Sequence, residues 1–158
     1  PTSEYLKQFS EQRFLLIATP ATITSGLYEK AVQGKVILDP LPIAELAGAI
    51  EFGAPEAEIE RILEDALASR KGETYDGLLL GCTHYPLVRD SIEKIARNYF
   101  GEVRIIDPAY PVAEAVCMQF DTSGRGTTQF FISRESGAFS KKVEKLFSTA
   151  IYSIETLV

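Results

Sequence analysis

Short apolar runs alternate with amphipathic stretches along this chain. Residues 14–18 and 77–81 are almost wholly apolar, which is typical of strands buried on both faces of a sheet. Shorter β-prone runs occur in KVILDPLP, VRIIDP, TTQFFIS and YSIETLV. We expect the KVILDPLP strand to end at Pro40, because proline cannot donate a hydrogen bond to a sheet.

Helical periodicity fills the intervals between these runs. In APEAEIERILEDALASRKG, Pro55 lies near the first turn, acidic residues come early, and Gly72 is the expected stop. Its apolar residues Ile59, Ile62, Leu63, Ala66 and Leu67 share one face. Further helices are predicted in TSGLYEKAV (capped by Thr24 or Ser25), IAELAGAIEF, LVRDSIEKIARNYF, PVAEAVCMQF and GAFSKKVEKLF. Buried strands alternating with helices predict an α/β fold with a parallel sheet sandwiched by helices.

Composition narrows the class of protein. The 158 residues are 46% hydrophobic and 24% charged, which is enough to bury a core. Neither a bilayer-length apolar run nor a secretory signal is present, so we expect a cytoplasmic protein with no membrane partner. The net charge of −6 is dispersed, which argues against nucleic acid. Two cysteines without zinc-site spacing predict reduced thiols and no metal.

The loop GCTHYP carries the candidate chemistry. Cys82 directly follows an apolar strand, and His84 is the only histidine. Unpaired backbone N–H groups and a following helix favour thiolate over thiol, and His84 can donate or accept a proton. Thr83 offers a hydroxyl and an N–H to an anionic group. A buried structural thiol beside a loop histidine is the competing interpretation. Because loops at the carboxyl ends of parallel strands converge, ATPAT and GCTHYP should share one edge.

The segment GLLLGCTHYPLV resembles the second-cysteine signature of the glutamate racemases, within the aspartate/glutamate racemase superfamily. The segments LIATPATITSGLYEKAV, AIEFG, RIIDPAYPVAEAV and TTQFFISRESGAFSKKVEKLF are similar to other parts of that family. The resemblance implies a flavodoxin-like racemase domain plus part of a second such domain. Residues 1–103 would form the second α/β domain, and residues 104–158 would be a segment returning to the first.

The resemblance also implies an activity. Two cysteines on opposite faces of the α-carbon would interconvert L- and D-glutamate without a cofactor, supplying D-glutamate for peptidoglycan and cell wall biogenesis. Cys82 would be the second base, His84 would assist it, and Thr83 with His84 would hold the substrate. Glu51 would act on the histidine side of the site, with a solvated helix face as the competing interpretation. Thr19 and Thr22 would line the crevice or merely cap a loop.

The family's Asp-Ser and Cys-Asn-Thr motifs do not occur in this sequence. Cys117 lies in an apolar helical pattern and is expected in the core rather than as a base. The chain begins at Pro1 and its only methionine is Met118, so we expect a processed chain or a piece of a longer protein. By itself it should carry half of the active site and be inactive.

Three alternatives remain open. An aspartate racemase-like enzyme is the nearest, although His84 after Cys-Thr favours glutamate. A non-catalytic domain that binds dicarboxylates or a protein is the second. The third is a thiol hydrolase using Cys82 and His84, for which the sequence indicates no oxyanion site. The sequence leaves the oligomeric state open, a homodimer included.

Overall fold

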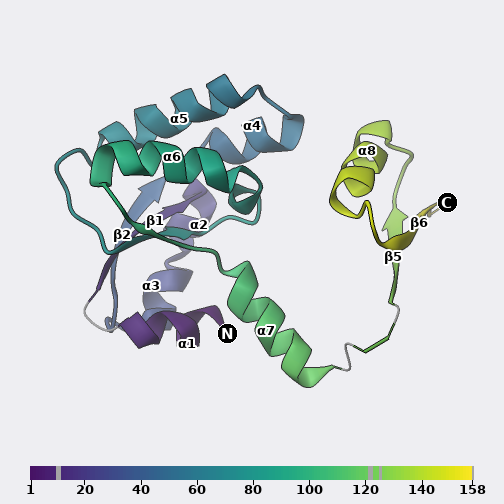
Figure 1. Ribbon diagram of the computed structural model, residues 1–158, viewed down its shortest axis with the longest axis horizontal. Coiled ribbons are helices and arrows are strands. Elements are labelled where there is room, and N and C mark those ends of the chain that lie inside the picture. Colours follow the sequence, from purple (N-terminus) through teal and green to yellow (C-terminus); the bar gives the residue numbers. More distant parts are fainter. Residues whose placement is uncertain (10–11, 121–122, 125, 158) are drawn as a thin grey trace. The chain divides into compact units, whose positions relative to one another are not determined.

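The computed structural model describes residues 1–158 except 10–11, 121–122, 125 and 158. The chain forms two compact units, Pro1–Gln119 and Phe120–Val158 (Figure 1). The expected division into 1–103 and 104–158 concerns a longer protein and stays a prediction.

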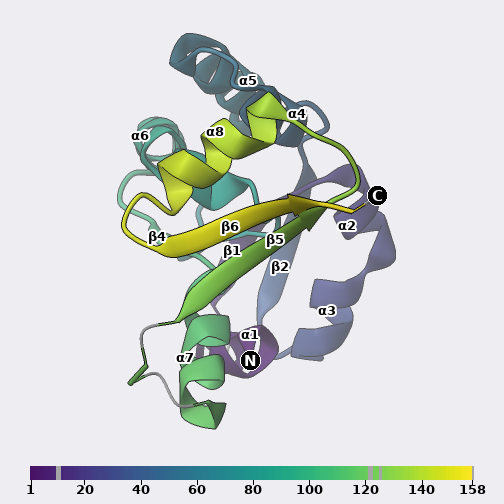
Figure 2. The same ribbon diagram turned by 90° about the vertical axis from the view of Figure 1, so that its right-hand side faces the viewer.

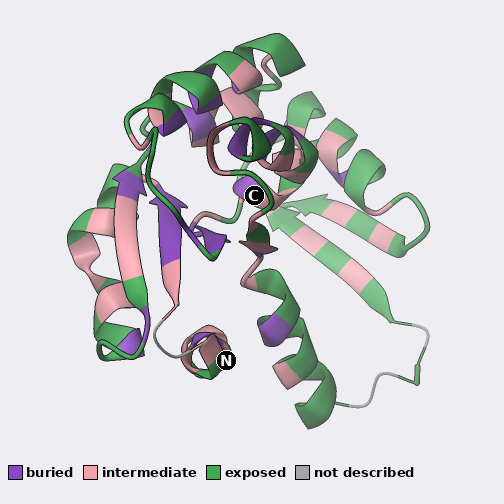
Figure 3. Ribbon diagram, turned by 60° about the vertical axis from the view of Figure 1, so that its left-hand side comes forward, coloured by how far each residue is buried: buried purple, intermediate pink, exposed green. Residues whose placement is uncertain are grey.

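The first unit is built on a four-stranded parallel sheet. Its strands are β1 (Arg13–Ala18), β2 (Ile37–Pro42), β3 (Gly77–Leu80) and β4 (Arg104–Ile106), in the order β2-β1-β3-β4. β1 and β3 are adjacent and parallel, so the loops that follow them lie at one edge, as predicted. Figure 3 shows that burial is concentrated in these central strands.

Helices cover both faces of this sheet, which confirms the predicted α/β class. Leu15 and Ile17 of β1 point into a core closed by α4 (Leu46–Phe52), α5 (Glu56–Ala68) and α6 (Arg89–Phe100). Phe14 and Leu16 point into a second core closed by α1 (Thr2–Leu6) and α3 (Leu27–Val32). The alternation follows from the two-residue period of a strand. The other helical segments of this unit are α2 (Pro20–Ser25), α7 (Ala109–Gln119) and the 3₁₀ turns η1 (Lys7–Phe9) and η2 (Tyr85–Val88).

The prediction that the second strand ends at Pro40 is wrong. β2 continues through Pro40 to Pro42 at the edge of the sheet, where it pairs with β1 alone. The N–H groups of Ile37 and Ile43 donate to β1 or its flanking residues. Since N–H directions alternate along a strand, both prolines direct their nitrogens away from β1. No ladder hydrogen bond is lost.

Two helix ends also differ from expectation. The ATPAT segment is not a loop: Thr19 caps α2, and Pro20 occupies its first position, where its fixed φ suits a helix. Gly26, with φ of 61°, separates α2 from α3. α5 ends at Ala68 rather than continuing to Gly72. The apolar face predicted for α5 is confirmed, since its members pack in the core.

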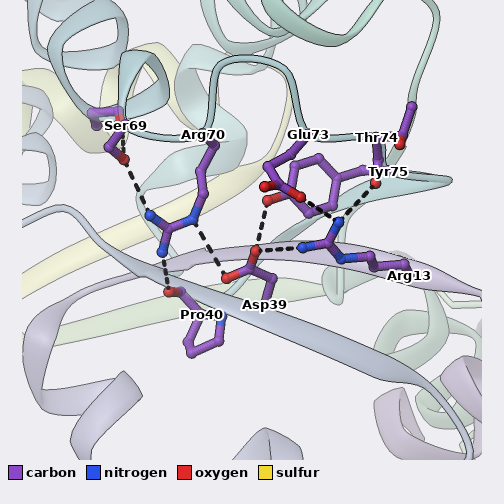
Figure 4. A network of polar contacts seen from close by, with 9 residues as sticks. Arg13, Asp39, Pro40, Ser69, Arg70, Glu73, Thr74 and Tyr75 are labelled. Atoms are coloured by element: carbon purple, nitrogen blue, oxygen red, sulfur yellow. Dashed lines mark hydrogen bonds and ion pairs between the residues drawn. The ribbon is translucent and has the colours of Figure 1, made fainter.

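A polar network ties together the start of the sheet (Figure 4). Arg13 is the first residue of β1, so the network lies at the opposite end from Cys82, which follows the end of β3. The guanidinium of Arg13 contacts Asp39 at 3.1 Å and Glu73 at 2.7 Å. Asp39 also contacts Arg70 at 3.4 Å and accepts a 2.7 Å hydrogen bond from the Tyr75 hydroxyl. Three segments distant in sequence are thereby fixed to one another.

The second unit contains β5 (Thr127–Ile132), α8 (Gly137–Leu146) and β6 (Ile151–Thr156). The two strands pair in parallel, and α8 lies over one face of the pair (Figure 2). Phe130 anchors this packing through edge-on contacts with Phe139, Phe147 and Tyr152. Phe131 and Ile151 are exposed. Two paired strands are marginally stable without further packing, and α8 covers only one face of this pair.

Candidate functional site

Gly81 brings the end of β3 close to β1, and this contact positions the loop that carries Cys82. Its N–H donates to the Ile17 carbonyl at 2.8 Å. A Cβ on Gly81 would meet the Ala18 Cβ and a Leu16 methyl, each at 2.8 Å. The close approach therefore requires glycine. Cys82 follows directly and is partly buried.

The loop is also fixed from beneath by Tyr85. This side chain is fully buried and donates a 3.2 Å hydrogen bond to the Ile43 carbonyl. Burial, and secondarily the charge of a Cys82 thiolate, raise the pKa of Tyr85. Tyr85 therefore stays a neutral donor that anchors the loop to the end of β2.

Cys82, His84 and Glu51 form a continuous polar line. The Cys82 Sγ lies 3.8 Å from His84 Nδ1, and His84 Nε2 lies 2.8 Å from Glu51 Oε2. An ionised carboxylate can only accept, so Nε2 carries the proton in the neutral ring. The lone pair of Nδ1 then faces the sulfur. This arrangement lets His84 take a proton from the thiol while Glu51 stabilises the resulting imidazolium.

Both members of the His84–Glu51 pair are accessible to solvent and solutes. Their side chains are 34% and 48% exposed, respectively. Glu51 lies on α4, 33 residues before the histidine. Glu51 is therefore both on the exposed side of its helix and in contact with the histidine.

A pocket of about 420 Å³ opens beside the sulfur. Its wall is mostly apolar and is formed by Tyr28, Leu80, Gly81, Cys82, Thr83, Pro86, Asp107, Pro108, Ala109 and Val112. Tyr28 and Asp107 were not singled out from the sequence, because neither belongs to a motif of the GCTHYP kind. Burial raises the pKa of Tyr28, and the charge of a Cys82 thiolate adds to the rise. The phenol therefore stays protonated at the pocket wall.

The loop that carries the cysteine also has backbone donors without a partner. Within the described part of the chain, the N–H groups of Cys82, Thr83 and His84 donate no hydrogen bond. The α-helix expected directly after this loop begins only at Arg89, behind η2. The unpaired loop amides, rather than a helix terminus, are therefore the local electropositive groups for an anionic oxygen.

The remaining predicted residues lie elsewhere. Thr19 Oγ1 accepts from the Thr22 N–H at 3.4 Å and lies 3.0 Å from its hydroxyl, so this pair caps α2. Neither threonine lines the pocket. The prediction that Cys117 lies in the core is wrong: it is exposed on α7, a largely apolar helix whose only buried residue is Pro111.

The described residues contain neither a metal-binding cluster nor a membrane-spanning helix. They contain no group of three or more histidine, cysteine or acidic side chains that could hold a metal ion. Among the same residues, every helix is too short or too polar to cross a bilayer.

The fold and this crevice define an α/β protein with a cysteine and a histidine at the carboxyl edge of a parallel sheet. Residues 2–116 match the family described as Asp/Glu/Hydantoin racemase. This chain belongs to that family.

Curated relatives support the assignment. Glutamate racemase from Persephonella marina is 32% identical over 156 residues, covering 93% of this chain and 57% of that protein. Glutamate racemase from Lactobacillus acidophilus is 30% identical over 140 residues, covering 85% of this chain and 47% of the relative. The chain thus spans about half the length of the curated relatives it matches.

Solved structures have the same fold. Glutamate racemase isoform RacE1 from Bacillus anthracis superposes with a TM-score of 0.80 at 23% identity, covering all of this chain and 62% of that one. Glutamate racemase from Francisella tularensis, in complex with D-glutamate, gives a TM-score of 0.77 at 24% identity over 99% of this chain and 61% of that one.

Proposed function

We propose that this chain carries one proton-transfer half of a cofactor-independent glutamate racemase that supplies D-glutamate for peptidoglycan. The observation that carries the proposal is the line from Cys82 through His84 to Glu51 beside a pocket. The family assignment and the D-glutamate complex of the Francisella relative favour this substrate.

In the proposed mechanism, His84 takes the thiol proton and leaves Cys82 as thiolate. The thiolate removes the α-proton of glutamate, and the electron pair delocalises into the α-carboxylate. The unpaired amides of Thr83 and His84 bind carboxylate oxygen and stabilise the added charge. A second thiol returns a proton from the opposite face, which inverts the centre. The reverse reaction uses the same groups in exchanged roles.

The second thiol would come from outside the described residues. Cys117 is the other free cysteine they contain, and it does not line the pocket. The exposed apolar side chains of α7, including Val112, Val116 and Met118, favour a further protein surface near this helix. Residues of β5 and β6 that are exposed in this chain could pack against a further domain. They therefore support the proposal that residues 104–158 are a segment that joins another domain. The proposed location is the cytoplasm, where the thiols stay reduced.

Inversion measured by circular dichroism tests the proposal. The protein produced from its whole open reading frame should convert either D- or L-glutamate into an equal mixture of the two enantiomers. It should convert glutamate far faster than it converts aspartate. Comparable or faster inversion of aspartate would favour the aspartate racemase alternative. Inversion of neither amino acid would contradict the proposal.

Calorimetry on the 158-residue chain separates the half-site from a binding domain. We expect no inversion and weak or undetectable glutamate binding, because only one wall of the substrate site is present. Tight binding of glutamate without α-proton exchange, in the whole protein as well, would instead identify a non-catalytic dicarboxylate-binding domain.

A further inference from the structure

The orientation of His84 suits nucleophilic chemistry as well as proton transfer. Its Nδ1 faces the Cys82 sulfur at 3.8 Å, while its Nε2 is held by Glu51 at 2.8 Å. A thiol, a base and a group that orients the base are the three parts of an activated nucleophile. All three come from the described residues of the first unit, so no second cysteine is required.

From this geometry we propose that the 158-residue chain is a thiol esterase toward small, neutral acyl esters. This activity uses the same Cys82–His84–Glu51 line as the proposed racemisation, but it forms an acyl–sulfur bond and needs no second cysteine. The sulfur adjoins a pocket of about 420 Å³ whose walls include Leu80, Pro108 and Val112. Apolar walls of this kind accommodate a short acyl chain.

The reaction balances with water as the co-reactant. His84 takes the Cys82 proton, and the sulfur bonds to the ester carbonyl carbon while the carbonyl electron pair moves to oxygen. The C–O bond then breaks, and the leaving alkoxide or phenoxide takes the proton from His84. Water next gives a proton to His84 and attacks the thioester. The C–S bond breaks, the acid departs, and the proton returns to sulfur.

The sequence indicated no oxyanion site, and the structure supplies a candidate. The amides of Cys82, Thr83 and His84 are unpaired among the described residues. Two of these residues, Cys82 and Thr83, line the pocket. Preorganised backbone donors of this kind stabilise a tetrahedral intermediate without reorganisation.

Cys117 provides an internal control within the same chain. Its thiol is exposed, and the chain has only one histidine, which faces Cys82. Exposure alone would make Cys117 the more reactive of the two thiols, since Cys82 is partly buried. Preferential reaction at Cys82 would therefore report activation rather than access.

The experiment is acetylation of the 158-residue chain by p-nitrophenyl acetate at about pH 7, with nitrophenolate release followed by absorbance and the acetyl group located by peptide mass spectrometry. We expect Cys82 to be acetylated about 100-fold faster than Cys117, and then to lose the acetyl group to water. Equal rates at the two cysteines, or faster reaction at Cys117, would overturn the proposal. Both rates are measured in the wild-type chain, so the comparison does not depend on whether a variant folds.

Variants then separate chemistry from positioning. His84→Asn should lower acetylation of Cys82 about 100-fold and leave Cys117 unchanged. Glu51→Gln should lower it less and alter its pH profile, because Glu51 acts through the histidine. Cys117→Ala should match the wild type in Cys82 acetylation and turnover. If His84→Asn reacts at the wild-type rate with an unchanged far-ultraviolet spectrum, the proposed base is wrong.

Discussion

At the residue scale, Glu51 illustrates what a single sequence can and cannot predict. Its helix, α4, follows from local periodicity, but its contact with His84 joins residues 33 positions apart. The sequence around Glu51 does not distinguish its carboxylate from that of any solvent-exposed glutamate on a helix. Only the resemblance to a family pointed to Glu51. The loop carrying Cys82 and His84 could be predicted from the sequence because the two residues are separated by one position and follow a wholly apolar strand.

Tyr75 makes a pH-dependent contribution to stability. Burial, followed by the hydrogen bond to Asp39 and its charge, raises the pKa of Tyr75 to about 12. The unfolded value is about 10, so the folded state binds the phenolic proton more tightly. This stabilisation is fully present below about pH 10 and is lost as the pH rises through about 12.

Tyr75→Phe should remove that dependence. We expect the variant to lose about 1 kcal/mol of unfolding free energy at neutral pH, because a partly buried hydrogen bond to a carboxylate is lost. Between about pH 10 and 12 its unfolding free energy should fall less steeply than that of the wild type. Urea denaturation at several pH values measures both effects. If the unfolding free energies of the two proteins fell equally steeply with pH, the raised pKa would not belong to Tyr75.

At the element scale, local patterns predicted the strands and helices because each element has its own apolar period. The errors arose where tertiary context decides. Pro40 is tolerated because β2 is an edge strand, and strand order is not visible in a local pattern. Cys117 is exposed because the helix around it buries little within the described unit, although its composition is that of a core helix.

The two glycines Gly77 and Gly48 make a matched test of close packing in the sheet. A Cβ on Gly77 would lie 2.6 Å from the Phe14 ring and 2.7 Å from the Arg104 carbonyl oxygen. Gly77→Ala should therefore destabilise the protein by about 1–3 kcal/mol through overpacking. Gly48 lies within α4, with nothing within 4 Å of an added Cβ, so Gly48→Ala should stabilise by up to about 1 kcal/mol.

Thermal or urea unfolding compares the two variants under one set of conditions. Opposite signs are expected for the two changes in unfolding free energy. A neutral Gly77→Ala would mean that β1, β3 and β4 can separate without cost at this point.

At the scale of the whole molecule, the two units should differ in local stability. β1 and β3 are buried between two layers of helices, whereas within the described residues β5 and β6 pair only with each other. Hydrogen exchange followed by mass spectrometry should show slow exchange in β1 and β3 and fast exchange in β5 and β6. Equal protection of both pairs in the 158-residue chain would contradict the view that the second unit is marginal by itself.

The most direct test of the central claim, that Cys82 serves one face of glutamate, is α-proton exchange in deuterated water. ¹H NMR of D- and L-glutamate would be recorded with the protein from the whole open reading frame, as wild type and as the Cys82→Ala and Cys117→Ala variants. We predict inversion with α-deuteration for the wild type and Cys117→Ala, and loss of inversion for Cys82→Ala. Inversion by folded Cys82→Ala at the wild-type rate would contradict the account.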